Sequence, residues 1–291
     1  MTTSRTSTGI AYDRAGPRAD LPVVLIHAGV ADRRMWDPLW PALTAESDVV
    51  RLDLRGFGES SQRPRGALSP VHDVLDTLAE LAIGRCHLVG ASFGAGVAVE
   101  VALTRSELVD SLLLSAPGGS LIAEVTPDLR AFIEAERSAL ACDDVDGAVE
   151  ANVAWWVHGA RGPASGVDPA VSDLVRQMQR RAFEVTAGWD DVEELDLDPA
   201  ALERLAEIRV PTMVLVGALD LQAVQAVQDA ARRVSDGIAG ARRVDWPDTA
   251  HLPSMEHPDD FLALLRDWLT PGTLATRRDP CSGRKRHGGG W

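Results

Sequence analysis

Residues Gly90–Gly94 have the sequence Gly-Ala-Ser-Phe-Gly and lie between a short apolar run and a segment with helical spacing. A serine on such a tight strand-to-helix turn presents its hydroxyl above the end of a sheet, and small neighbours are required because the turn is strained. The helix that follows supplies backbone N–H groups that stabilise a developing oxyanion. The pattern predicts that Ser92 is a nucleophile. The alternative interpretation is an ordinary glycine-rich turn.

A serine hydroxyl is a weak nucleophile that needs a base, and the base needs an orienting acid. His251 follows the predicted strand Ala241–Trp246 in a loop, and Asp220 lies just beyond the predicted strand Val214–Gly217. We predict His251 as the base and Asp220 as the acid, because Asp220 ends a strand at the edge of the sheet where α/β proteins bind ligands. Asp248 is the competing acid, although a carboxylate three residues before a histidine usually caps a turn.

Short apolar segments alternate with segments of helical spacing along most of the chain. The apolar runs are rich in Val and Leu, as expected of strands covered on both faces. The predicted strands are Val23–Ile26, Val49–Leu54, Cys86–Val89, Leu112–Ser115 and Met213–Val216, and the predicted helices between them include Val71–Leu81, Phe93–Leu103 and Phe261–Leu269. This alternation predicts an α/β fold with a mainly parallel central sheet and helices on both faces.

Residues 120–200 interrupt that rhythm with helices only, predicted at Asp128–Leu140, Val145–Val157 and Pro169–Thr186. We interpret this segment as an inserted helical cap on a core formed by residues 1–119 and 201–270. Residues 271–291 are rich in glycine and arginine and lack apolar periodicity, so we predict a disordered tail.

The overall composition bounds the function. The chain has 291 residues, of which 45% are hydrophobic and 25% charged, which suffices for a sizeable core. Its net charge of −14 disfavours nucleic-acid partners. The sequence contains no run of about 18 apolar residues, so we predict no membrane-spanning helix. The polar N-terminus lacks the apolar segment of a secretory signal. We expect a cytoplasmic protein whose partner is a small-molecule substrate, with neither nucleic acid nor membrane; the oligomeric state stays open.

These motifs, in this order, resemble the α/β-hydrolase superfamily over about residues 9 to 270. The order Ser92, Asp220, His251 is that of its catalytic triad. Besides the Gly90–Gly94 turn, the matching segments are His27-Ala28-Gly29, Asp53–Ser60, Val216–Asp220 and His251–Pro258.

The resemblance implies where an oxyanion would bind. The family takes one backbone N–H from the residue after the nucleophile, here Phe93, and a second from the loop after the first buried strand. The closest matching position is Gly29, two residues after His27, and Val30 is the next candidate. Ala28 stands where the family usually has glycine. Asp53 is expected to hold the Arg55–Ser60 loop rather than to act in catalysis.

The sequence looks most like the single-cap branch that includes carboxylesterases and 3-oxoadipate enol-lactonases. This implies cleavage of a small ester or lactone by a serine hydrolase without metal or organic cofactor. Val30, Trp155 and Trp156 are candidates for the substrate pocket, and plain helix packing is an equal alternative for the tryptophans. Three other functions stay open: a carbon–carbon bond hydrolase of the meta-cleavage type, a cofactor-free perhydrolase, and a ligand receptor on the same fold.

Overall fold

The strands of the chain form one mainly parallel sheet. The computed structural model describes residues 3–159, 162, 166–219 and 225–270. Within them lie β1 (Ser4–Arg5), β2 (Ala11–Ala15), β3 (Val23–Ile26), β4 (Val49–Leu52), β5 (Cys86–Ala91), β6 (Val109–Ser115), β7 (Thr212–Gly217) and β8 (Arg242–Trp246). Their order in the sheet is β1-β2-β4-β3-β5-β6-β7-β8. The β1–β2 and β2–β4 pairs are antiparallel, and all pairs from β4 to β8 are parallel. The predicted α/β fold is confirmed, whereas the antiparallel β1 and β2 were not predicted.

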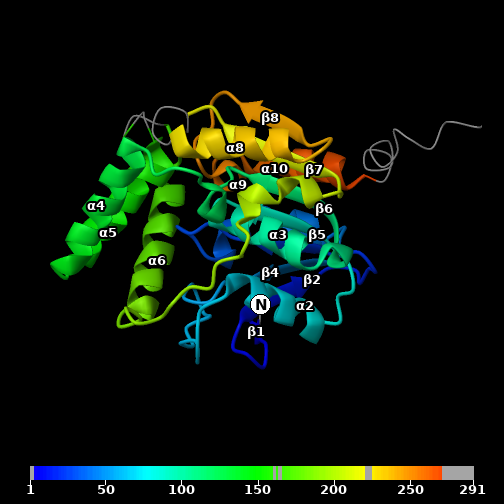
Figure 1. Cartoon of the computed structure of the whole chain (residues 1–291), viewed down its shortest axis with the longest axis horizontal. Helices are drawn as coiled ribbons and strands as arrows, with labels where there is room; N and C mark the ends of the chain where they lie inside the picture. The colour runs from blue at the N-terminus through cyan, green and yellow to red at the C-terminus, as the bar shows by residue number, and fades with distance from the viewer. Residues whose placement is uncertain (1–2, 160–161, 163–165, 220–224, 271–291) are drawn as a thin grey trace, which may run out of the picture.

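Each face of the sheet is buried under its own layer of helices. Successive side chains of a strand point to opposite faces, so Val24 and Ile26 of β3 join one apolar core while Val23 and Leu25 join the other. The first core includes side chains of α2 (Pro70–Glu80), α3 (Phe93–Thr104) and α8 (Gln225–Gly237). The second includes side chains of α1 (Trp40–Thr44), α9 (Pro253–Glu256) and α10 (Pro258–Leu269). Of these helices, α9 and α10 are labelled in Figure 1. Burial on both faces explains why the central strands are almost wholly apolar.

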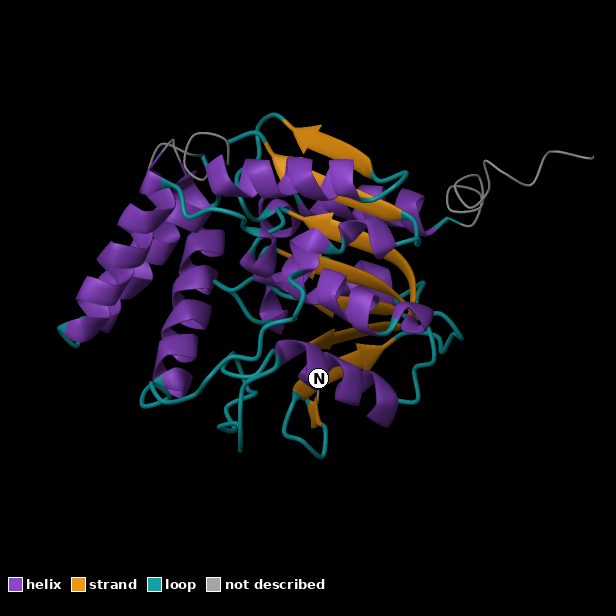
Figure 2. Cartoon of the chain, viewed as in Figure 1, coloured by secondary structure: helices purple, strands orange, loops and turns teal. Residues whose placement is uncertain are grey.

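Three further helices lie beyond the ends of the strands. They are α4 (Pro127–Ala141), α5 (Val145–Asn152) and α6 (Pro169–Thr186), with α4 packed against α5 and α5 against α6. Figure 2 shows the arrowheads of the parallel strands pointing toward the side of the molecule where these helices lie. The carboxyl ends of the strands therefore face the segment that we propose as a cap.

The helix predicted over Val145–Val157 changes type part of the way along. It is α-helical to Asn152 and continues as a π-helix over Val153–His158. The i→i+5 hydrogen bonds of a π-helix widen the turn, and two successive tryptophans, Trp155 and Trp156, both pack against the Phe132 ring from this widened segment.

None of the helices within the described ranges combines the length and apolar character that a membrane-spanning helix requires. The tail predicted at 271–291 lies outside the described residues.

Candidate active site

Ser92 lies on a strained turn between β5 and α3. Its φ of 51° and ψ of −115° fall in a region that non-glycine residues rarely occupy. A Cβ at Gly90 or at Gly94 would come under 3.0 Å from backbone atoms, which real Cβ atoms essentially never do. The two glycines of the motif are therefore needed for close backbone approach on both sides of the turn. The Ser92 side chain makes no helix-capping hydrogen bond, so its hydroxyl is available to the site.

The structure brings Ser92 and His251 together. Ser92 Oγ lies 2.8 Å from His251 Nε2, although the residues are 159 positions apart in sequence. His251 is 2% exposed, and the Trp156 ring lies against its imidazole with 4.5 Å between ring centroids. The predicted nucleophile and base are thus within hydrogen-bond distance in a site largely shielded from water.

Glu256 supports the loop that carries His251. Its carboxylate accepts hydrogen bonds of 2.8 Å from the backbone N–H groups of Ala250 and Leu252, the residues on either side of the histidine. The carboxylate therefore fixes the backbone on both sides of His251. Glu256 belongs to the matching segment His251–Pro258, but its spacing from His251 did not predict that its carboxylate would hold the backbone of this loop.

Of the two candidate acids, Asp220 and Asp248, the structure describes Asp248. Asp220 lies outside the described residues. Its neighbour in sequence, Leu219, donates a 3.0 Å hydrogen bond from its backbone N–H to the Thr249 carbonyl in the histidine loop. Asp248 is exposed and lines a separate surface cavity with Trp246 and other residues of its loop.

Backbone donors lie beside Ser92, as the oxyanion prediction requires. Gly29, Val30 and Phe93 line the same cavity as Ser92, and a Cβ built on Gly29 would lie 3.3 Å from the Phe93 Cβ. The Phe93 N–H belongs to the first helical residue and has no intrahelical partner. Within the described ranges, no hydrogen bond uses the backbone N–H of Gly29, Val30 or Phe93.

The His27 ring positions the loop that contains Gly29. His27 Nε2 accepts a 2.9 Å hydrogen bond from the Leu54 N–H, and Nδ1 lies 2.8 Å from the Ala28 carbonyl oxygen. This pattern requires a proton on Nδ1 and none on Nε2, so the ring is neutral. Complete burial lowers the pKa of His27 below its ordinary value. The Leu54 bond also explains why the strand predicted over Val49–Leu54 ends at Leu52.

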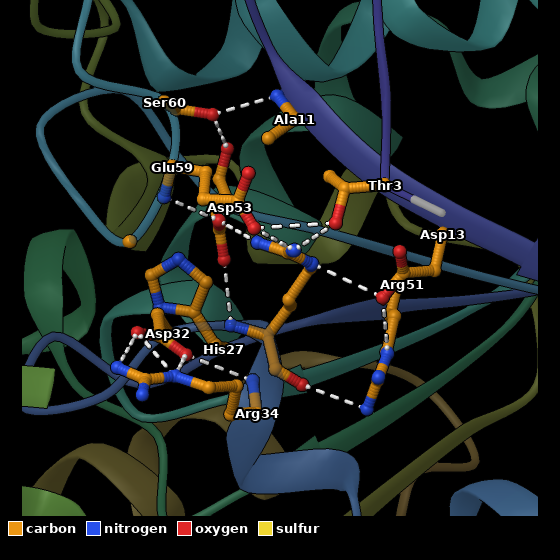
Figure 3. Close-up of polar contacts among 12 residues, drawn as sticks. Thr3, Ala11, Asp13, His27, Asp32, Arg34, Arg51, Asp53, Glu59 and Ser60 are labelled. Atoms are coloured by element: carbon orange, nitrogen blue, oxygen red, sulfur yellow. Dashed lines mark hydrogen bonds and ion pairs between the residues drawn. The ribbon is translucent and has the colours of Figure 1, made fainter. Parts of the chain in front are cut away.

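Asp53 joins the backbone at Arg33 to the Arg55–Ser60 loop, and Figure 3 shows its contacts with Glu59 and Ser60. Its Oδ1 accepts from the Arg33 N–H and its Oδ2 from the Glu59 N–H, both at 2.8 Å, while the Ser60 hydroxyl donates to its carbonyl. The Arg33 guanidinium pairs with the same carboxylate. Burial raises the pKa of Asp53, and Arg33 opposes that shift. Asp53 is therefore a structural carboxylate, as the motif predicted.

The ion pairs extend from Arg33 toward the edge of the sheet. The Arg33 guanidinium also contacts Asp13 and Glu59, and Asp13 pairs with Arg51, whose guanidinium stacks over the Trp40 ring at 4.2 Å. This network was not predicted, because its members are far apart in sequence.

A cavity of about 550 Å³ lies over Ser92. It is lined from the core by Gly29, Val30 and Phe93, and from the helices beyond the strand ends by Phe132, Trp156 and Phe183. Trp156, predicted as a pocket residue, lines the cavity. Trp155 packs against Phe132, 5.9 Å between ring centroids, and is not among the lining residues. Among the described residues, no three His, Cys, Asp or Glu side chains gather into a group that could hold a metal ion.

Known proteins resemble this chain over most of its length. It is 26% identical over 265 residues to a 2-hydroxy-6-oxo-6-(2'-aminophenyl)hexa-2,4-dienoic acid hydrolase of Metapseudomonas resinovorans, with 88% of this chain and 86% of the relative covered. It is 26% identical over 245 residues to a pimeloyl-[acyl-carrier protein] methyl ester esterase of Edwardsiella ictaluri, with 84% and 91% covered.

A solved structure of a hydrolase from Pseudomonas aeruginosa PA01 is also similar, with a TM-score of 0.70, 27% identity, and 92% of this chain and 98% of that chain covered. Residues 23–264 match the model of the alpha/beta hydrolase family. That match spans the sheet from β3 to β8 and both of the residues that meet at 2.8 Å, Ser92 and His251. The chain therefore belongs to the alpha/beta hydrolase family and is a hydrolase of that fold.

Proposed function

We propose that this chain is a serine hydrolase that cleaves a small ester or lactone, with Ser92 as nucleophile, His251 as base and Asp220 as acid. The observation that carries the proposal is the 2.8 Å contact between Ser92 Oγ and His251 Nε2 on a strained turn beneath a cavity. A nucleophile and a base within hydrogen-bond distance, next to unused backbone donors, is the arrangement that acyl transfer requires.

In the first half of the reaction, Ser92 Oγ bonds to the substrate carbonyl carbon while its proton passes to His251 Nε2. The carbonyl oxygen becomes an oxyanion that accepts hydrogen bonds from the Phe93 and Gly29 N–H groups, with Val30 next to them. The tetrahedral intermediate then expels the alcohol oxygen, which takes the proton from His251. An acyl group stays on Ser92; with a lactone, the alcohol stays attached to that acyl group.

Water completes the cycle. His251 removes a proton from the attacking water, whose oxygen bonds to the acyl carbon. The second tetrahedral intermediate expels Ser92 Oγ, which recovers its proton from His251 and releases the carboxylic acid. We assign the acid that orients His251 to Asp220 because Leu219 is hydrogen-bonded to the histidine loop, whereas Asp248 lies exposed beside a different cavity.

Carbon–carbon bond hydrolysis is the second candidate, and the Metapseudomonas resinovorans relative favours it. The substrate in the name of that relative is a keto-dienoic acid without an ester bond, so its hydrolysis breaks a carbon–carbon bond. The Edwardsiella ictaluri relative is named as a methyl ester esterase and favours the first candidate.

Comparing substrate classes decides between the two. We expect p-nitrophenyl esters of short acyl chains, or lactones, to exceed a vinylogous diketone by at least about tenfold in kcat/KM, which corresponds to about 1.4 kcal/mol in transition-state stabilisation. Stopped-flow measurement with an activated ester should show a burst of leaving group when deacylation is the slower step. A tenfold preference for the diketone would support the second candidate. Tight binding of either class with negligible turnover would instead indicate a receptor.

A further inference from the structure

Three side chains with carboxylate or amide groups line the cavity over Ser92 from the helices beyond the strand ends. Glu136 comes from α4, Asn152 from α5 and Gln179 from α6. We call Glu136, Asn152 and Gln179 the polar cluster. The mechanism proposed above uses none of the three, although they share the cavity with Ser92.

The hydrogen bonds within the polar cluster leave acceptor atoms unused. Asn152 Nδ2 donates to Glu136 Oε2 at 2.5 Å and to the Ala148 carbonyl at 3.0 Å, which occupies both of its protons. Among the described residues, the other Glu136 oxygen and the Asn152 side-chain oxygen accept no hydrogen bond. The cluster therefore has hydrogen-bond acceptors to offer and no donor proton left on Asn152.

Gln179 gives the second, independent indication of a ligand. It is 5% exposed, and its Oε1 is buried without any hydrogen-bond partner in the part of the chain that the structure describes. A buried acceptor that is left unpaired costs roughly 1–3 kcal/mol, and such groups are rare in folded proteins. A bound ligand that donates a hydrogen bond to Gln179 removes that cost.

Charge indicates which donor the cavity prefers. Glu136 is the one ionisable residue among the described side chains that line the cavity; none of them is Lys, Arg or His. Arg137, the next residue along α4, is exposed and does not line the cavity. Burial raises the pKa of Glu136 above its ordinary value, an effect that a bound cation would reverse. The aromatic rings of Phe132, Trp156 and Phe183 in the same lining also favour a cation over an anion.

We propose that the polar cluster binds a protonated amine carried by the substrate at the end remote from the scissile carbonyl. An ammonium group has three N–H donors and no acceptor, and the unused oxygens of Glu136, Asn152 and Gln179 supply three acceptors. This inference rests on the proposed ester or lactone hydrolysis and specifies its substrate as an amine-bearing ester. It also disfavours carboxylic acids such as the dienoic acid named for the Metapseudomonas resinovorans relative, because a carboxylate would face Glu136 with no described cation in the lining.

Calorimetric titration of the Ser92→Ala variant tests the proposal without turnover. The probes are hexylammonium, hexan-1-ol and hexanoate, which share a six-carbon chain and differ in the end group. Because hydrogen bonds to charged groups contribute more than neutral ones, we expect hexylammonium to bind at least about tenfold more tightly than hexanol. Hexanoate should bind more weakly than hexanol. Equal binding of hexylammonium and hexanol, or tighter binding of hexanoate, would overturn the proposal.

Variants in the Ser92→Ala background assign the effect to the polar cluster. Glu136→Gln removes the charge and should reduce the preference for hexylammonium over hexanol to less than about threefold. Glu134→Gln is the matched control, because it removes the same charge from the exposed side of the same helix; the preference should be retained. Gln179→Met keeps the shape, changes no charge and should also weaken hexylammonium binding, so it tests the cluster even where Glu136→Gln impairs folding.

Two results from these variants would refute the assignment: an unchanged ammonium preference in Glu136→Gln, or an equal loss in Glu134→Gln. Failure of the proposed function itself has a separate signature, the absence of ester turnover in the unmutated enzyme, which the binding measurement does not involve.

Discussion

The loop that carries His251 offers a sharp test of how the candidate site is held in place. Glu256 accepts two 2.8 Å hydrogen bonds, from the N–H groups of Ala250 and Leu252. Glu256→Gln keeps the length of the side chain but leaves one acceptor oxygen, so one of the two N–H groups faces an NH₂ group instead. Hydrogen bonds to charged groups contribute about 1.5–3 kcal/mol. We therefore expect a loss of about 1.5–3 kcal/mol in the free energy of unfolding.

The same substitution should slow catalysis, because the backbone on one side of His251 is no longer held by its hydrogen bond to residue 256. A displacement of a catalytic group by about 1 Å costs on the order of 100-fold, so kcat should fall by roughly 10- to 100-fold with KM little changed. Urea unfolding and steady-state kinetics with an activated ester measure the two effects. Asp267→Asn, an exposed carboxylate in α10, is the control and should change stability by less than about 0.5 kcal/mol. Unchanged kcat in Glu256→Gln would refute a positioning role.

Three further predictions follow from buried charge and from the acid assignment. Because the pKa of folded His27 lies below its ordinary value, the unfolded chain binds more protons below about pH 6.5, so the free energy of unfolding should fall as the pH drops below that value. His27→Gln should show a shallower pH dependence in urea unfolding. Asp53→Asn removes one of the three carboxylates that pair with the buried Arg33 guanidinium, while Asp13 and Glu59 remain. It should cost roughly 1.5–3 kcal/mol of stability, the contribution of hydrogen bonds to charged groups, whereas Glu46→Gln, which breaks an exposed pair, should cost less than about 1 kcal/mol. Asp220→Asn should lower kcat by about 10⁴-fold while the protein stays folded, and Asp248→Asn should lower it far less; the reverse order would show that the acid is wrongly assigned.

The sequence predicts best where local patterns determine the structure. The strand at Val23–Ile26 and the helix at Pro169–Thr186 have the predicted bounds. The helix begins after Asp168, whose side chain caps it, and has Pro at its first position, both of which are local signals. The turn at Ser92 is also determined locally, because its two glycines, the strand before it and the helix after it are all adjacent in sequence. The pairing of Ser92 with His251 was predicted because a serine nucleophile needs a base and because His251 lies in a loop just after a predicted strand; the family resemblance agreed with it.

Features built from distant residues were not predicted. β2 carries Asp13 and Arg14 among its five residues, so it lacks the apolar character of the central strands, and Asp13 is buried only because Arg33 and Arg51 pair with it. The polar cluster depends on how α4, α5 and α6 face one another. Periodicity places a residue on one side of its own helix, but it does not determine which residues of neighbouring helices meet.

The central claim is that Ser92 is a nucleophile activated by His251, and labelling with a fluorophosphonate probe tests it most directly. We expect one covalent adduct per chain, located at Ser92 by peptide mass spectrometry. Ser92→Ala should remove both the adduct and the ester turnover, since loss of such a nucleophile lowers the rate on the order of a millionfold. Labelling of Ser92→Ala to the same extent as the unmutated protein would show that Ser92 is not the nucleophile.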